Sequence, residues 1–440
     1  MKYFFLFIFS LCNFCYAQTK TDLIKIVADD RADRDCFGWS TSIYGNYCIV
    51  GAVRRKAKKL TGHRLLPEGG GAYIFAKQPK GNWLQTQLLL PDQPKENDFY
   101  GGCVSMYDGF IAVGCNGDDD VEKDSDSFNR KGAVYIYKLN KQGVWSKTQK
   151  IILEDRTSRD DFGEQVFLYK KTLAVSARYK PFKDPKIKGA VYIYEQSPAG
   201  SWIQKHSIIC PEKDVVQFGH SISLSDSLLV IGSLMLENTY VYKLTINNTW
   251  ALIKKLSATN TSDAGFGRSV CIKNNIVCVG AYGIFDPNDS TDNSDTLAYR
   301  KKHLLGSGAV YIYEMDIKNN LNFKQRIVAK DIKADMHFGM CMSISDSLLV
   351  IGAFGDALDV DNLPGNRYAG AAYIFKQNTL GEWIETKKIT SPQRSVWDKF
   401  AFSVSAYKKT VIIGSRFEKE NAQEKQPIFE AGAAYIYEDK

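Results

Sequence analysis

Lys25-Ile-Val-Ala-Asp-Asp-Arg-Ala-Asp-Arg-Asp-Cys-Phe-Gly38 is the stretch that decides the fold, because the chain repeats it as Lys150-Ile-Ile-Leu-Glu-Asp-Arg-Thr-Ser-Arg-Asp-Asp-Phe-Gly163. In both copies an apolar run typical of a strand ends in a charged turn, and a Phe-Gly pair then opens the next hydrophobic segment. The first copy has no repeat unit in front of it. We therefore expect this N-terminal strand to complete the last unit of the chain and to close a ring.

The Phe-Gly signal recurs along the chain and predicts seven units. It stands at Phe37-Gly38, Tyr100-Gly101, Phe162-Gly163, Phe218-Gly219, Phe266-Gly267, Phe338-Gly339 and, in degenerate form, Phe400-Ala401. These units start near residues 35, 98, 160, 216, 264, 336 and 398. After each pair comes a short strand, a tight turn and a second strand ending in small residues, such as Val279-Gly280-Ala281. Unit three has Ser176 where the other units have that glycine.

The third strand of each unit is the clearest, as in Gly132-Ala-Val-Tyr-Ile-Tyr137 and Gly308-Ala-Val-Tyr-Ile-Tyr313, whereas unit four offers only Thr239-Tyr-Val-Tyr242. Alternating aromatic and β-branched residues suit a half-buried strand, and the leading glycine allows close backbone approach. A turn then leads to a fourth, amphipathic strand. It begins near Trp83, Trp145, Trp202, Trp250, Phe323 or Trp383. Four strands per unit follow.

These patterns predict an all-β fold, a seven-bladed β-propeller of four-stranded antiparallel blades, in one domain over residues 18–440. No segment keeps the i, i+3, i+4 apolar spacing of an ordinary helix. Four-stranded units at regular spacing are typical of radial repetition around a central channel. Unit seven stops at Tyr437-Glu-Asp-Lys440, directly after its third strand. The strand at 23–28 supplies the missing fourth one and pairs an otherwise open edge.

Residues 1–17 form an apolar leader with a small residue, Ala17, at its end, which predicts a secretory signal peptide. The run is shorter than the roughly 20 residues that span a bilayer, and no transmembrane segment is expected later. We expect a secreted or cell-surface protein, extracellular or periplasmic. The formal charge of +8 arises from Lys and Arg spread among similar numbers of Asp and Glu, which is typical of a solvated surface. Basic loops such as Arg54 to Lys59 could meet anionic glycans, whereas a nucleic-acid partner is not favoured.

The order of Phe-Gly, strand, Val-Gly-Ala, polar loop and Gly-Ala-Val-Tyr-Ile-Tyr resembles the FG-GAP repeat of the seven-bladed propeller at the head of integrin alpha chains. The resemblance covers essentially the whole chain after the leader. It implies extracellular recognition of a protein or glycan, of the cell-adhesion type, often with calcium bound in loops of the blades.

Acidic loops after the second strands of three units are candidate calcium sites. Alternating side-chain oxygens are typical of calcium loops, but the glycine usual at the sixth position is replaced by Lys123 in unit two and by Thr291 in unit five. A merely solvated loop is the alternative. The candidate ligands are Asp118, Asp120, Glu122, Asp124 and Asp126 in unit two, Asp286, Asn288, Ser290 and Asp292 in unit five, and Asp356, Asp359 and Asp361 in unit six.

Other reactive side chains have simpler interpretations. The serine that follows several Phe-Gly pairs is an architectural position, because the repeat places Ser40, Cys103, Gln165, Ser221, Ser269, Cys341 and Ser403 there in turn. No helix follows it, as a nucleophile elbow requires. Cys271 and Cys278 face each other across a two-residue turn and are the candidate disulfide, with buried free thiols as the alternative. His220 and His337 flank Phe-Gly pairs and are expected near one end of the ring.

Three functions remain open from the sequence. The one we favour is a non-enzymatic recognition propeller that binds a protein or glycan through loops on one rim. The second is a propeller hydrolase or lyase whose catalytic carboxylates converge in the central channel from several blades. The third is a structural subunit of a surface assembly. The side chains that line the channel discriminate between the first two.

Overall fold

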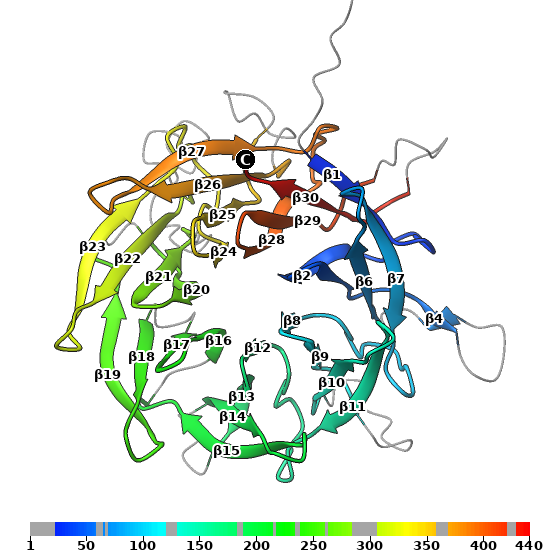
Figure 1. Cartoon of the computed structure of the whole chain (residues 1–440), viewed down its shortest axis with the longest axis horizontal. Coiled ribbons are helices and arrows are strands. Elements are labelled where there is room, and N and C mark those ends of the chain that lie inside the picture. Colours follow the sequence, from blue (N-terminus) through cyan, green and yellow to red (C-terminus); the bar gives the residue numbers. More distant parts are fainter. Residues whose placement is uncertain are drawn as a thin grey trace, which may run out of the picture.

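The computed structural model describes residues 23–58, 65–66, 69–119, 130–182, 188–213, 217–233, 238–259, 263–283, 306–357, 368–419 and 428–440. Within these ranges the regular structure is all β, with seven four-stranded antiparallel sheets arranged as blades around a central axis (Figure 1). The predicted seven-bladed propeller is therefore confirmed. In the same ranges, none of the chain forms a helix with the length and hydrophobicity of a membrane span.

Each blade runs from an inner strand beside the axis to an outer strand at the rim. The inner strands are β2 (Phe37–Tyr44), β8 (Val104–Tyr107), β12 (Val166–Tyr169), β16 (Phe218–Leu224), β20 (Phe266–Lys273), β24 (Cys341–Ile344) and β28 (Phe400–Tyr407). The second strands are β3 (Tyr47–Ala52), β9 (Phe110–Cys115), β13 (Thr172–Pro181), β17 (Leu228–Ser233), β21 (Ile276–Ala281), β25 (Leu349–Ala353) and β29 (Thr410–Ser415).

The third and fourth strands complete the blades. The third strands are β6 (Gly71–Lys77), β10 (Ala133–Leu139), β14 (Lys188–Gln196), β18 (Asn238–Leu244), β22 (Ala309–Met315), β26 (Ala371–Gln377) and β30 (Ala433–Glu438). The outer strands are β7 (Trp83–Leu89), β11 (Trp145–Ile151), β15 (Trp202–Ile209), β19 (Trp250–Ser257), β23 (Leu321–Ile327), β27 (Trp383–Ile389) and β1 (Leu23–Ile26). A short ribbon of β4 (Ala57–Lys58) and β5 (Leu65–Leu66) follows the second strand of blade one.

The N-terminal strand β1 closes the ring as predicted. It pairs antiparallel with β30, with Leu23 opposite Tyr437 and Ile26 opposite Ala434 (Figure 1). The Lys25 ammonium lies 3.2 Å from a carboxylate oxygen of Glu418, whose side chain is 1% exposed. This buried ion pair ties the first strand to the last blade.

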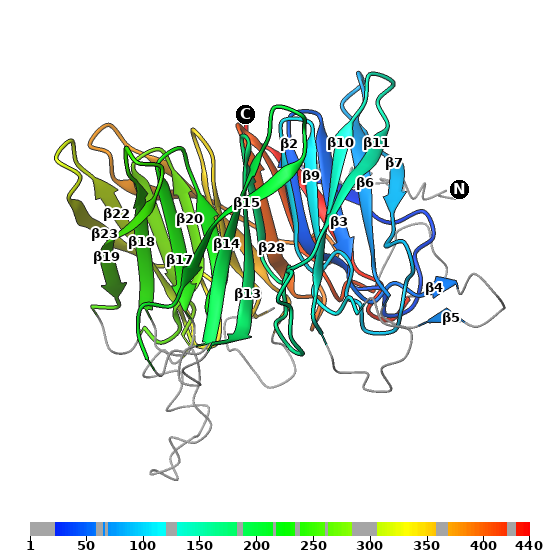
Figure 2. The same cartoon turned by 90° about the horizontal axis from the view of Figure 1, so that it is seen from below.

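The two faces of the ring carry different connections. Short hairpins join the first to the second strand and the third to the fourth on one face, together with the C terminus, and the longer loops emerge on the other (Figure 2). We call these the hairpin face and the loop face. Every Phe-Gly pair and the start of every third strand lie at the loop face, because successive strands alternate in direction.

The core repeats one aromatic contact in every blade. The Phe-Gly aromatic ring packs against the tyrosine at the centre of the third strand, with centroids 5.3–5.9 Å apart. These third-strand tyrosines are Tyr73, Tyr135, Tyr192, Tyr240, Tyr311, Tyr373 and Tyr435. One expectation is wrong in detail: the outer strand of blade five begins at Leu321, which occupies the tryptophan position opposite Met315, and Phe323 is exposed.

The glycine at the end of the second strand fixes how closely neighbouring blades approach. A Cβ added at Gly414 would lie 2.1 Å from the backbone oxygen of Gly38 in the next blade, and Gly38 itself has φ of +93°. Only residues without a Cβ fit this approach without moving the backbone. The same contact recurs at Gly51, Gly114, Gly232, Gly280 and Gly352.

Candidate functional site

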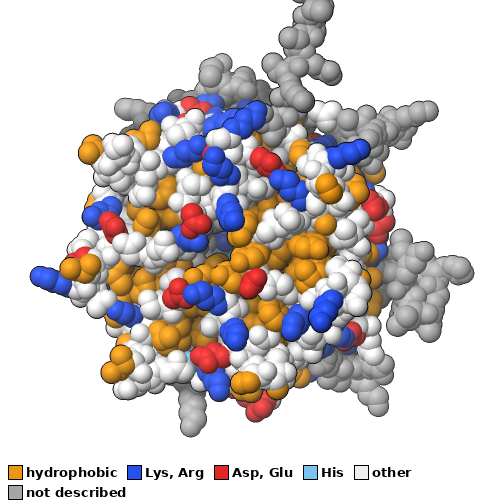
Figure 3. Space-filling model, in the orientation of Figure 1, with side chains coloured by type: hydrophobic (Ala, Val, Ile, Leu, Met, Phe, Trp, Pro, Cys, Tyr) orange, Lys and Arg blue, Asp and Glu red, His pale blue; other side chains and the backbone are white. Residues whose placement is uncertain are grey.

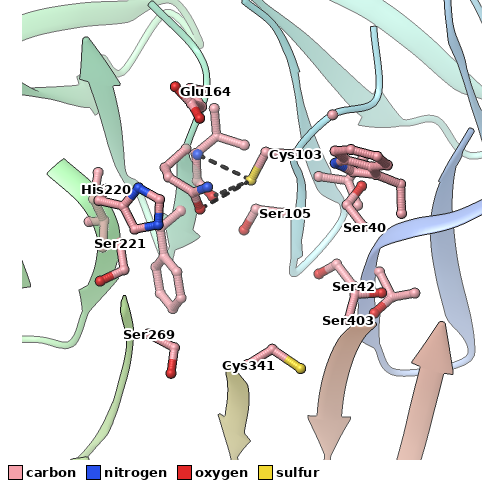
Figure 4. Close-up of a pocket in the computed structure, with 18 of the residues that line it drawn as sticks. Ser40, Ser42, Cys103, Ser105, Glu164, His220, Ser221, Ser269, Cys341 and Ser403 are labelled. Atoms are coloured by element: carbon pink, nitrogen blue, oxygen red, sulfur yellow. Dashed lines mark hydrogen bonds between the residues drawn. The ribbon is translucent and has the colours of Figure 1, made fainter. Parts of the chain in front are cut away.

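The inner strands of all seven blades surround a central cavity of about 580 Å³ (Figure 4). Most side chains that line it are small or apolar, such as Ser40, Ser403 and Val404. Arg54, Arg178 and Arg268 join its wall. It is the candidate functional site because it collects polar side chains from every blade.

The hydroxyl and thiol groups on the cavity wall hold neighbouring blades together. At the position after Phe-Gly-x, a side chain of one blade donates a hydrogen bond to a backbone oxygen of the next. The donors and acceptors are Ser40 to Gly101 (2.8 Å), Ser221 to Gly267 (2.8 Å), Ser269 to Gly339 (2.6 Å), Cys341 to Ala401 (3.2 Å) and Ser403 to Gly38 (2.9 Å). The architectural interpretation of this position agrees with these contacts.

A second set of serines, two residues further along five of the inner strands, accepts hydrogen bonds from backbone N–H groups of the next blade. The acceptor and donor pairs are Ser42 with Met106 (2.9 Å), Ser105 with Leu168 (2.9 Å), Ser223 with Ile272 (3.1 Å), Ser343 with Ala406 (2.9 Å) and Ser405 with Ile43 (3.2 Å). These oxygens serve the framework, and none of them is paired with an imidazole as a nucleophile requires.

The junction between blades three and four departs from this pattern. Gln165 and Phe167 replace the two serines, and Ser176 replaces the glycine at the end of the second strand. Ser176 accepts a hydrogen bond from the backbone N–H of Gln165 within its own blade (3.0 Å). The junction therefore lacks both framework hydrogen bonds, and apolar packing of Phe218 and its neighbours joins the blades there instead.

A charged cluster lies in the cavity at this junction. Arg178 forms an ion pair with Glu164 and approaches His220 Nδ1 at 3.2 Å, and Arg268 contacts the other ring nitrogen of His220. Glu164 and His220 project into the cavity from neighbouring blades (Figure 4). A neutral imidazole has only one acceptor nitrogen, so it can accept a hydrogen bond from one of the two guanidinium groups but not from both.

Burial shifts the titration of this cluster. It raises the pKa of Glu164 to about 7, against the lowering effect of the Arg178 charge. It also lowers the pKa of His220 well below its ordinary value, and the charges of Arg268 and Arg178 act in the same direction. His220 is therefore neutral at neutral pH, and the Glu164 carboxyl group gains or loses its proton near pH 7.

The loop-face mouth also gathers cations and aromatic rings from blades six, seven and one. The Arg416 guanidinium lies 3.8 Å from the ring centroid of Phe402 and 4.5 Å from that of Trp39. The Lys399 ammonium lies 4.9 Å from the centroid of Phe417. Burial lowers the pKa of Lys399 to about 8, and the charge of Arg416 acts in the same direction. Burial also lowers the pKa of Arg416 to about 10, and the charges of Arg54 and Arg268 act in the same direction.

The hairpin-face mouth is different in kind. Tyr407, Tyr44, Tyr107 and Tyr169 form an arc of packed rings, with consecutive centroids 4.6, 4.7 and 5.2 Å apart. Hydrophobic side chains gather around the centre of this face beside β2, β8 and β28 (Figure 3). The Lys170 ammonium at this end is paired with Asp226.

Two predicted calcium ligands lie in the described part of the chain, and both are held by cations. Asp118 accepts a hydrogen bond from Tyr135 (2.7 Å) and pairs with Lys150 (2.9 Å). Asp356 is fully buried and pairs with Lys388 (2.8 Å) and with Arg394. These cations already engage both oxygens of Asp118 and Oδ2 of Asp356, so neither carboxylate fits a calcium ion as it stands.

The remaining predicted ligands lie outside the described residues. These are Asp120, Glu122, Asp124, Asp126, Asp286, Asn288, Ser290, Asp292, Asp359 and Asp361. Over the described ranges, no group of three or more His, Cys, Asp or Glu side chains is arranged to hold a metal ion. The leader at 1–17 also lies outside the described residues.

The two candidate disulfide cysteines are brought together as expected, but as free thiols. Cys271 lies directly opposite Cys278 in the β20–β21 pair. Both are buried, and a hydrogen bond between them together with burial raises the pKa of Cys271 well above its ordinary value. A protonated, buried thiol is a weak nucleophile. The disulfide itself stays a prediction.

Comparison with known families accounts for this architecture. A family model described as the FG-GAP repeat matches residues 21–75, 83–137, 145–194, 321–375 and 383–437, which together make up more than half of the chain. The chain belongs to the FG-GAP repeat family. No curated protein matches it. Each FG-GAP match begins on an outer strand and ends on a third strand, so the repeat unit is offset by one strand from the blade.

That offset explains the closure of this FG-GAP propeller. The first match contains β1 together with the first three strands of blade one. The last match ends at Tyr437, after the third strand of blade seven. Blade four and most of blade five lie between the matches. Their strands, β16 to β19 and β20 to β23, nevertheless follow the same order as those of the matched blades. The fold therefore persists where the sequence signal weakens.

Several side chains of the site were not singled out from the sequence. Arg178 lies in β13 and Arg416 directly follows β29, and nothing in the linear pattern marks either of them. A signal was available for Glu164 and Arg268, because both stand between the Phe-Gly pair and the architectural serine position, which faces the axis. Both histidines predicted at one end of the ring do lie at the loop face: His220 lines the cavity and His337 stacks on Phe354 (5.0 Å).

Proposed function

We propose that this chain is an exported, non-enzymatic recognition propeller that binds a protein or glycan through the loop-face mouth. Membership of the FG-GAP family supports a binding or adhesion-type propeller in general terms. The observation that carries the proposal is the contrast between the cavity wall and the mouth. Wall hydroxyls such as Ser403 and Ser405 are engaged in framework hydrogen bonds, whereas Arg416 and Lys399 lie against aromatic rings and form no ion pair among the described residues.

A binding assay in a defined orientation tests the proposal. The C terminus lies on the hairpin face (Figure 2), so a C-terminal tether presents the loop face to solution. The full chain, tethered in this way, is passed over a panel of extracellular polysaccharides and surface proteins. We expect saturable binding of at least one ligand without loss of that ligand over time. A chain that consumes its ligand is an enzyme and would contradict the proposal.

The enzyme alternative rests on one observation, the cluster of Glu164 and His220 in the cavity. A carboxyl group whose pKa is about 7 beside a neutral imidazole is a pattern that general acid–base sites also show. Against it, Arg178 pairs with the carboxylate and both imidazole nitrogens face guanidinium groups. Glycosides, esters, phosphoesters and acidic polysaccharides are the substrates to offer. Turnover that disappears in Glu164→Gln would establish a hydrolase or lyase in place of our proposal.

Calcium binding is a separate part of the proposal and concerns the acidic loops of units two, five and six. Because Asp118 and Asp356 are already paired with cations, the loop residues beyond them would have to supply the oxygens. A melting scan of the full chain with millimolar calcium and with chelator measures this directly. Binding to the folded state alone raises the melting temperature through a stabilisation of RT ln(1 + [L]/Kd). Identical curves would remove calcium from the proposed function.

A further inference from the structure

An aromatic file crosses the loop-face mouth from blade six to blade one. We define it as Trp397, Tyr368, Phe354, Phe402 and Trp39. Trp397 and Tyr368 are stacked with centroids 4.6 Å apart and an interplanar angle of 24°, and Tyr368 is stacked on Phe354 at 5.8 Å. Phe402 continues the file, 6.0 Å from Phe354 and 5.4 Å from Trp39. Trp397 is 49% exposed, so one end of the file is open to solvent.

Two cations are fixed along this file. The Arg416 guanidinium lies over Trp39 and Phe402, and also 4.4 Å from the centroid of Phe417. The Lys399 ammonium lies 5.5 Å from the centroid of Phe354 and 5.6 Å from that of Tyr368. Cation–π contacts hold the side chains in place without neutralising their charge. The two charges therefore have fixed positions beside flat apolar surfaces.

Neither cation has a carboxylate partner within the described part of the chain. Glu430 is the acidic residue whose field reaches both of them, and it forms no ion pair with either. The buried Nε of Arg416 has no hydrogen-bond acceptor among the described residues. By contrast, Lys25 at the closure of the ring is paired with the buried carboxylate of Glu418. A buried guanidinium N–H without an acceptor is costly, so an anionic ligand would gain from supplying one.

We propose that the aromatic file with Arg416 and Lys399 binds an acidic polysaccharide, with carboxylate or sulfate groups on the two cations and a sugar ring against Trp397. This inference rests on the proposed function and names its ligand class. Guanidinium groups bind carboxylate and sulfate oxygens through paired hydrogen bonds. A flat aromatic ring with one free face suits the apolar face of a sugar, and sites of this kind combine apolar surface with a few fixed polar groups.

The geometry favours this class over two others. A nucleic acid stacks its bases between or upon free rings, but most rings of the file are already covered by one another or by a cation. An acidic peptide would satisfy the charges but has no use for the exposed face of Trp397. Both classes are outcomes of the test below.

The test uses the full chain, tethered through its C terminus, and five probes: polygalacturonate, dextran sulfate, neutral dextran, polyglutamate and a single-stranded oligonucleotide. We expect binding to one or both acidic polysaccharides, and the first two probes distinguish carboxylate from sulfate recognition. Arg416→Gln and Lys399→Gln should each weaken that binding at least about tenfold, which corresponds to the loss of one charge-assisted contact. Trp397→Ala should weaken it several-fold, and Arg416→Lys should retain part of it.

Lys170→Gln is the matched control, because it removes a cation from the hairpin face. It should leave the affinity unchanged, and each variant is first shown to melt cooperatively like the parent. Should Arg416→Gln fail to fold, Lys399→Gln and Trp397→Ala carry the test. Equal weakening by Lys170→Gln, or binding of polyglutamate or the oligonucleotide as tightly as the polysaccharides, would overturn the inference.

The remaining outcomes separate this inference from the proposed function. Binding of a surface protein or of neutral dextran, with no affinity for either acidic probe, overturns the inference and leaves the proposed function standing. Consumption of an acidic polysaccharide, with affinity still lost in Arg416→Gln, supports the ligand class and overturns the non-enzymatic function. No binding of any of the five probes overturns the inference.

Discussion

Two of the junctions between neighbouring blades are held together by different contacts. The junction between blades seven and one, where the chain begins and ends, keeps every framework contact: Ser403 donates to Gly38, Ser405 accepts from Ile43, and Gly414 packs on the Gly38 oxygen. The junction between blades three and four, where the chain is continuous, lacks all three. Covalent continuity is therefore not what makes blades pack alike. Residue identity at three positions of the inner and second strands decides it.

The junction between blades three and four is also where charged side chains line the cavity. Once Gln165 and Phe167 replace the serines, the wall no longer needs to be lined by small groups, and Glu164, Arg178 and His220 occupy the cavity there. Departures from a repeated pattern are the expected places for function. Four experiments test this difference between the two junctions, beginning with the change that we expect to have the largest effect.

Removal of β1 should have the largest effect. A chain that begins at Asp29 loses the four-residue pairing with β30 and the buried pair of Lys25 with Glu418, which leaves Glu418 buried and uncompensated. We expect loss of cooperative unfolding and aggregation through the open edge of β30. Thermal unfolding followed by circular dichroism, with size-exclusion chromatography, measures both. A shortened chain that melts like the parent would show that β1 does not close the ring in solution.

A single methyl group should distinguish the two junctions next. Gly414→Ala places a Cβ about 2.1 Å from the Gly38 oxygen, so the backbone of blade seven or one has to move. We expect a loss of roughly 3 kcal/mol in the free energy of unfolding, at the upper end for overpacking. Its control is Ser176→Ala at the equivalent position of blade three, where a Cβ is already accommodated. That variant loses one hydrogen bond and about 1 kcal/mol. Denaturant titration compares the two, and equal losses would refute the distinction.

The framework serines should contribute less, and only where their partners exist. Ser403→Ala removes the hydrogen bond to Gly38 and should lower the free energy of unfolding by about 1 kcal/mol. Gln165→Ala, at the same position of the inner strand in blade three, removes no hydrogen bond to the described residues of blade four and should cost less. The same titration serves for both variants. A larger loss for Gln165→Ala would mean that the junction between blades three and four has framework contacts of its own.

The last experiment concerns the pH dependence of stability and belongs to the junction between blades three and four. Burial raises the pKa of Glu164 from 4.5 to about 7, so the folded chain binds more protons than the unfolded chain between these values. Its contribution to stability is therefore present at low pH and declines as the pH rises from about 4.5 to about 7. Glu164→Gln should make the melting temperature less dependent on pH across this window. An unchanged slope would mean that Glu164 titrates normally in the folded chain.

The sequence alone determined the fold and its closure. The Phe-Gly pairs and the Gly-Ala-led third strands are local patterns, repeated often enough that the strand order could be predicted where one unit was degenerate. Blade seven keeps its framework even though Ala401 stands in place of glycine. The orphan strand before Phe37 and the missing strand after Tyr437 were complementary in the linear sequence, because the repeat unit is offset from the blade by one strand.

Only the tertiary structure decided the candidate site. Tyr368 precedes β26, Trp397 and Lys399 precede β28, and Arg416 follows β29. They become neighbours because the ring brings blades six and seven to the same mouth. Asp118 and Asp356 looked like metal ligands in the sequence, and the structure pairs them with Lys150 and Lys388 from the outer strands of their own blades. Strand periodicity specifies which face of a sheet a side chain occupies. Which charges lie together depends on contacts between segments far apart in the chain, and no local pattern records those.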